Sequence, residues 1–170
     1  MTMSKPNRAS VPYLPKHDAG LRSANDEDDP YRAAAKPPEP TTCPQCHATF
    51  NEGRWSWEKA PEDSYEHLCP ACQRIHDHFP AGYVVVKGDF FKDHRDEILH
   101  LIENHEKTEK ERRPLQRIMQ IEDTREGLQV TTTDSHLARG IAEALHDAYK
   151  GDLKLRYSRD ENLVRAVWKR

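Results

Sequence analysis

Regular patterns of apolar positions begin only in the second half of the chain. Residues 83–87, Tyr-Val-Val-Val-Lys, are a short β-branched run before a glycine and predict a strand. A helix capped by Asp93 is predicted next, because Ile98 and Ile102 recur there at helical spacing. This helix is expected to end in the charged stretch before Pro114.

A hairpin, a second helix and two more strands are predicted after it. In order, they are strands at 117–122 and 128–132, a helix that starts at Thr133 or Asp134 and ends before Gly151, and strands at 153–157 and 164–168. The order β-α-β-β-α-β plus a final strand is that of a ferredoxin-like, split-βαβ domain, predicted over 83–170. Both helices are expected on one face of its sheet. The fold class is therefore α+β.

The first 42 residues lack any such pattern. They contain seven of the twelve prolines, an acidic cluster at 26–29 and very few large aliphatic residues. Such a segment buries too little apolar surface to offset the entropy of ordering it. Residues 1–42 are therefore predicted to be a disordered, proline-rich tail.

Composition narrows the class of protein further. The 170 residues carry a formal charge of -3, the sequence pI is about 6.4, and mean hydropathy is -0.98. These values exclude a globally basic nucleic-acid binder but not a local basic surface. No apolar run is long enough to span a membrane, and no apolar segment follows the first residues as in a secretory signal. A cytoplasmic location without membrane contact is expected.

All four cysteines lie in two CxxC motifs, and their spacing carries the strongest chemical signal. Cys43 and Cys46 form the first motif, and Cys69 and Cys72 form the second after 22 intervening residues. Two such motifs complete a closed tetrahedral shell of thiolates, which predicts one structural zinc ion in a zinc-ribbon or treble-clef-like module over 43–80. An iron–sulfur cluster held by the same thiolates stays open as an alternative. Disulfides would require an oxidising compartment.

No catalytic pattern accompanies the cysteines. The chain has no phosphate-binding glycine loop, no HExxH and no GxSxG motif. Asp134, Ser135 and His136 are triad residue types, but adjacent side chains at a helix start do not face one another. We therefore expect neither an enzyme nor a small-molecule substrate.

A basic surface is expected on the predicted sheet. Lys154, Arg156, Arg165 and Lys169 alternate with core residues of the last two strands, so they share the face away from the helices. Such a face suits a phosphate backbone, although a solvated polar face is the ordinary alternative. Further RNA-binding candidates are His136 and Arg139 at a helix start, Arg112 and Arg113 at a helix end, and Trp55 and Trp57, which either stack on bases or pack the zinc module.

Three features of the sequence suggest a relationship to a known family. They are the cysteine module followed by a valine strand, the segment 127–139 (Gly-Leu-Gln-Val-Thr-Thr-Thr-Asp-Ser-His-Leu-Ala-Arg) and the segment 148–153. Over 41–170 the chain resembles a small bacterial family that is similar to the export adaptor of the large ribosomal subunit, the Nmd-three type. That adaptor has further zinc sites and domains. The resemblance implies a zinc-stabilised, non-catalytic protein that binds ribosomal surfaces.

These observations together predict an accessory factor that binds the ribosome or structured RNA. Its partner would be ribosomal RNA of the large subunit or of the intersubunit sites, as in a stress or hibernation factor. A zinc-dependent protein-interaction or transcriptional regulatory module is the alternative.

Overall fold

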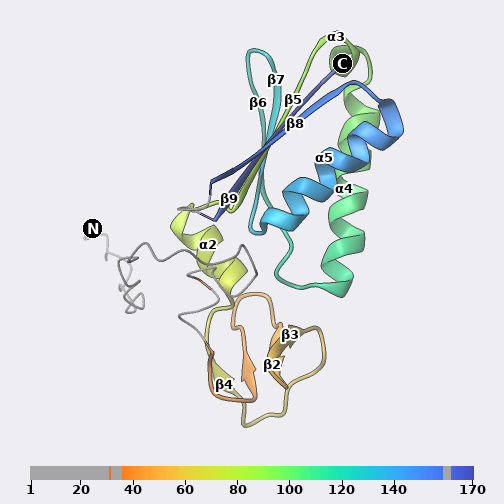
Figure 1. The fold of residues 1–170 in the computed structure, drawn as a ribbon. Helices are drawn as coiled ribbons and strands as arrows, with labels where there is room; N and C mark the ends of the chain where they lie inside the picture. Colours follow the sequence, from red (N-terminus) through yellow and green to blue (C-terminus); the bar gives the residue numbers. More distant parts are fainter. Residues whose placement is uncertain (1–30, 32–35, 159–161) are drawn as a thin grey trace, which may run out of the picture.

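Two mixed β-sheets and the helices around them make up the fold in the computed structural model, which describes residues 31, 36–158 and 162–170 (Figure 1). Residues 36–80 form one unit, here called the cysteine module. Residues 81–158 and 162–170 form the second unit, here called the α+β domain. The fold class is α+β, as the sequence predicts.

Four very short strands and one helix build the cysteine module. They are β1 (Thr41–Thr42), β2 (Thr49–Asn51), β3 (Arg54–Ser56), β4 (Tyr65–Glu66) and α2 (Pro70–Asp77). The sheet order is β3-β2-β1-β4, with β1 and β4 parallel. The buried apolar cluster of this unit centres on the cysteines themselves. Strands this short hold little core of their own, so the module depends on what links the cysteines.

The described part of the predicted tail belongs to this module. Strand β1 consists of two tail residues, and Tyr31 is only 4% exposed. The Tyr31 ring lies 6.0 Å from the Phe79 ring, and its hydroxyl donates to Asp77 over 3.1 Å. The prediction of disorder for residues 1–30 and 32–35 lies outside the described residues.

The α+β domain contains every strand and both long helices that the pattern predicts, and one short helix more. Its elements are β5 (Gly82–Lys87), α3 (Asp89–Asp93), α4 (Arg95–Arg112), β6 (Ile118–Asp123), β7 (Gly127–Thr132), α5 (Ser135–Tyr149), β8 (Asp152–Ser158) and β9 (Leu163–Lys169). None of the described helices combines the length and the apolar character that a bilayer crossing requires.

The start of α4 differs from the prediction. Asp93 does not cap this helix but ends the short helix α3, and His94 occupies the N-cap of α4 without a side-chain hydrogen bond. Helix α3 forms because Phe91 is buried in the core and Phe90 stacks on His94, with ring centroids 4.0 Å apart. Five residues are too few for a helical repeat of apolar positions to reveal this element in the sequence.

The strand order departs from a ferredoxin-like sheet, and that finer prediction is not confirmed. The order is β6-β7-β5-β9-β8. Strand β7 lies between β5 and β6 and is antiparallel to both, as a split βαβ unit requires. The strand after the second helix, β8, does not join β5, however. Instead β9 lies parallel to β5, and β8 is left at the edge.

Burial explains why β9 takes the inner position. Val164, Ala166 and Trp168 on one face of β9 are completely buried. Strand β8 (DLKLRYS) has fewer apolar residues than β9 (LVRAVWK), and at its edge position Leu155 is 37% and Tyr157 50% exposed. Because buried apolar area stabilises a fold in proportion to its size, the more apolar strand is favoured at the centre.

Both long helices cover one face of the five-stranded sheet (Figure 1). Ile98 and Ile102 of α4 join Leu137 and Ile141 of α5 in the buried cluster over the central strands. Trp168 completes this cluster, and its indole N–H donates to the Lys150 carbonyl over 2.7 Å. No helix of the described residues covers the opposite face of the sheet.

Candidate metal centre

Two different backbone structures bring the four cysteines together. Cys43 and Cys46 lie in the tight turn between β1 and β2, where the Cys43 N–H donates to the Ala48 carbonyl over 2.8 Å. Cys69 is the N-cap of α2, and its sulfur accepts the N–H of Cys72 over 3.4 Å. One pair therefore comes from a hairpin turn and the other from the first turn of a helix.

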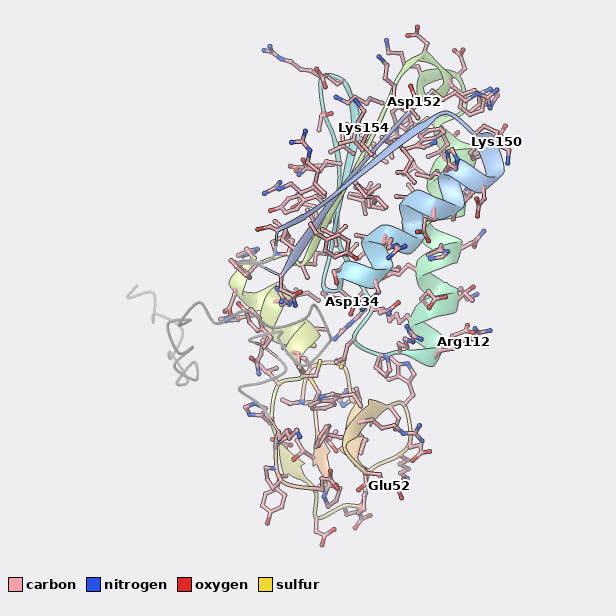
Figure 2. All side chains as sticks on the ribbon, viewed as in Figure 1. Glu52, Arg112, Asp134, Lys150, Asp152 and Lys154 are labelled. Carbon is pink, nitrogen blue, oxygen red and sulfur yellow. The ribbon has the colours of Figure 1, made fainter. Side chains whose placement is uncertain are left out.

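The positions of the sulfurs fit a single metal ion. All four Sγ atoms lie within 4.8 Å of one another, and those of Cys46 and Cys69 are 3.7 Å apart. Tetrahedral zinc with Zn–S bonds of about 2.3 Å places its sulfurs about 3.8 Å apart. The four thiols are free and three of them are buried. Figure 2 shows sulfur atoms gathered between α2 and the lower end of the α+β domain.

The hydrogen bonds that the four thiols share shift their pKa values in different directions. Hydrogen bonds with Cys46, Cys69 and Cys72 hold the pKa of Cys43 far below its ordinary value. The hydrogen bond with Cys43 raises the pKa of Cys46, but those with Cys69 and Cys72 outweigh it and lower that pKa to about 6. The pKa values of Cys69 and Cys72 are raised, chiefly by Cys43.

Arg117, which precedes β6 in the α+β domain, lies directly on this cluster. Its Nη2 atom is 3.1 Å from the Cys69 sulfur, 3.3 Å from that of Cys72 and 3.7 Å from that of Cys46. Burial acts to lower the pKa of Arg117, but the charges of the neighbouring thiolates outweigh burial and raise it. In the sequence Arg117 is one of several cations in a basic stretch, and nothing there marks it as a partner of the cysteines.

The four predicted sheet cations do share one exposed face, opposite the helices. Arg156 lies directly across from Arg165 in the β8–β9 register. Lys154 lies across from Val167, and Lys169 lies across from Asp152. The Arg165 guanidinium stacks on the Tyr83 ring at 4.6 Å. Within the described ranges, none of the four cations forms an ion pair.

The other predicted RNA contacts do not join this face. The Asp134 carboxylate accepts the N–H groups of His136 and Leu137 at the start of α5, over 2.8 Å and 3.1 Å. Arg139 pairs with Glu143 over 2.7 Å. The donors that a phosphate would need at this helix start are therefore already used. Arg112 and Arg113 are exposed at the end of α4, which covers the other side of the sheet (Figure 2).

The two tryptophans have separate roles in packing. Trp55 lies across from Phe50 in the β2–β3 pair, with ring centroids 5.4 Å apart, and packs against the cysteine cluster. Trp57 is 40% exposed, and its indole N–H donates to the Lys110 carbonyl of α4 over 2.7 Å. It therefore contacts the α+β domain from the cysteine module.

No protein-family model, no curated protein and no solved structure matches this chain. The functional argument therefore rests on the residues of the chain itself. They provide a four-cysteine site that could hold a metal ion.

Proposed function

We propose that this chain is a non-catalytic factor that binds structured RNA through the open face of its five-stranded sheet, with one structural zinc ion in its cysteine module. The observation that supports RNA binding is the direct opposition of Arg156 and Arg165, neither of which forms an ion pair with a described residue. The observation that carries the zinc part is the closed group of four sulfurs.

The paired arginines favour an anionic ligand because they are costly to the free protein. Like charges directly across two strands are destabilising. A phosphate group bound between the two arginines would replace their mutual repulsion by attraction to the ligand. Lys154 and Lys169 extend the same face along both strands. Tyr83 lies beneath Arg165, so the face offers little free aromatic surface for stacking on bases. It is suited to phosphates and RNA shape rather than to base sequence.

The metal part follows from the closed shell of ligands. Four thiolates leave no open coordination position, so the ion would hold the module together and not activate a substrate. A zinc-ribbon or treble-clef-like module is the form of this site that we propose, with one pair of sulfurs from a hairpin turn and the other from a helix start. Iron remains the competing metal for the same donors, and metal analysis of protein purified under reducing conditions decides between them.

Ribosomal RNA is the structured RNA that we propose as the partner. The resemblance of 41–170 to a bacterial family that is similar to the large-subunit export adaptor favours it, and we propose a cytoplasmic location for this role. A stress or hibernation factor is the form of this role that we propose. Sedimentation of the tagged chain through sucrose gradients tests it, in growing and in starved cells and at low salt. Co-migration with ribosomal particles is expected, and absence from all of them in both conditions would contradict it.

A protein partner is the second candidate, and the edge strand β8 favours it. Leu155 and Tyr157 of this strand are exposed apolar side chains. Charge reversal at Lys154, Arg156, Arg165 and Lys169 separates the two functions in an RNA gel-shift assay. Loss of RNA binding supports the basic face as an RNA surface. RNA binding that is unchanged by the reversal favours a protein-interaction module.

A further inference from the structure

One cation of the α+β domain completes the cysteine cluster of the other unit. Arg117 contacts three of the four sulfurs through a single Nη2 atom, at 3.1 to 3.7 Å. We propose that Arg117 is a positioning residue that makes docking of the cysteine module on the α+β domain depend on the bound metal. This inference rests on the metal site of the proposed function and not on RNA binding.

The charge of the metal centre gives the first reason. A divalent ion with four thiolate ligands carries two negative charges in excess, and this excess would be largely removed from water here, since Cys43 and Cys69 are fully buried. A buried charge requires a partner of opposite sign. Arg117 supplies one positive charge, and N–H donors to thiolates are the usual outer partners of such centres.

The isolation of the guanidinium gives the second reason. Arg117 is only 8% exposed, and its Nε atom has no hydrogen-bond partner within the described residues. Its side-chain hydrogen bonds to described residues all go to sulfur. Without the ion, no bond would hold these three sulfurs in place around the guanidinium, so this buried charge would lose the arrangement of its partners. Loss of the ion therefore favours separation of the two units.

The backbone of Arg117 is held firmly by the α+β domain. Its N–H donates to the Thr133 hydroxyl and its carbonyl accepts the Thr133 N–H, each over 2.9 Å. The Thr133 hydroxyl lies 2.6 Å from the Leu115 carbonyl, and the next N–H, of Ile118, donates to Glu106 over 2.8 Å. Gln116 and Arg117 are nearly completely buried at this interface, so undocking of the cysteine module would expose these backbone hydrogen bonds to water.

Few other contacts join the two units. Helices and strands of the cysteine module make no extensive backbone approach to those of the α+β domain in the described ranges. Leu115 packs against the cysteine cluster, and the Trp57 indole donates to Lys110 at an exposed position. The Arg117–sulfur contact is the buried ionic part of this interface, so its strength has a large effect on docking.

Hydrogen exchange and zinc competition on the full-length chain test this inference together. The variants are R117Q, which removes the charge, and R113Q, a control at an exposed arginine of the same α4–β6 connection. For R117Q we expect zinc affinity to fall about 10- to 100-fold against a chelator, the range found for partners that hydrogen-bond metal ligands. Amides of 113–118 should exchange faster in zinc-loaded R117Q, while those of 70–77 stay protected. R113Q should match the wild type in both.

A measurement on the wild type keeps the test decisive if R117Q does not fold. Removal of zinc from the unaltered chain should speed exchange at 113–118 while the central strands β5 and β9 remain protected. Unchanged exchange at 113–118 overturns the inference, as does R117Q that equals R113Q in zinc affinity and exchange. A chain that binds no zinc overturns the metal site as well. Failure of RNA binding alone leaves all these readouts unchanged, so the two proposals fail separately.

Discussion

Neutralising Arg156 and Arg165 together should reduce the salt dependence of RNA binding by an amount that the register predicts. These two residues face each other across β8 and β9, with Lys154 and Lys169 beside them on the same side. The logarithm of a binding constant falls with the logarithm of salt concentration by about 0.9 for each phosphate contact on a duplex. Four contacts give a slope of about −3.6, or about 150-fold weaker binding between about 50 and 200 mM salt.

The double variant R156Q/R165Q keeps two of these contacts. Its slope should be about −1.8, so the same rise in salt weakens binding only about 12-fold. Fluorescence anisotropy of a labelled RNA hairpin over a potassium chloride series measures both slopes. The variant should be at least as stable as the wild type in thermal unfolding, because a like-charge pair has been removed.

Lys87 provides the matched control on the same face. It lies across from Lys169 in the β5–β9 register but already pairs with Glu126 over 3.0 Å. K87Q should therefore leave the slope close to that of the wild type. The reasoning would be refuted by a double variant with an unchanged slope, or by K87Q with the same effect as the double variant.

Three further predictions concern the metal and the core. C69S should no longer bind one zinc ion per chain, and its cysteine module should be unfolded, because that module has little other core. Metal analysis and limited proteolysis check this prediction, and full zinc retention would contradict it. Zinc affinity should fall as the pH is lowered, since protons compete with zinc for the thiolates. The fall should be steeper below pH 6, because the pKa of Cys46 in the metal-free chain is about 6. Chelator competition across pH measures this, and a pH-independent affinity would argue against thiolate ligands. W168A should lower the free energy of unfolding of the α+β domain by about 3–5 kcal/mol in denaturant unfolding, because this side chain is completely buried. A decrease below about 1 kcal/mol would show that Trp168 is not a major part of the core.

The elements of the α+β domain were predictable because their patterns are local. Alternation at 128–132 and the helical repeat through Leu137 and Ile141 follow from the burial of one face of each element. Alternation at 153–157 also predicts β8, although only Leu153 of that strand packs against the core. The cysteine spacing likewise predicts the group of four sulfurs, since the types and positions of metal ligands are strongly constrained.

The remaining features depend on contacts between distant residues. The inner position of β9 depends on its pairing with β5, about eighty residues earlier, and on the greater burial of Trp168 compared with Tyr157. The contact between Arg117 and Cys69 joins two units whose separate patterns give no sign of each other. The short strands of the cysteine module are stabilised by neighbouring turns and cysteines rather than by any repeat that a sequence displays.

The inner position of β9 also has a consequence for synthesis. In a nascent chain, β5 is translated long before residues 163–169 emerge, so one side of its hydrogen-bonding backbone has no neighbour during that interval. Among the described strands, β9 is the only one that pairs with edge strand β8. Removal of residues 163–169 by premature termination or proteolysis would therefore detach β8 as well, and would expose the apolar surface of β5 to aggregation.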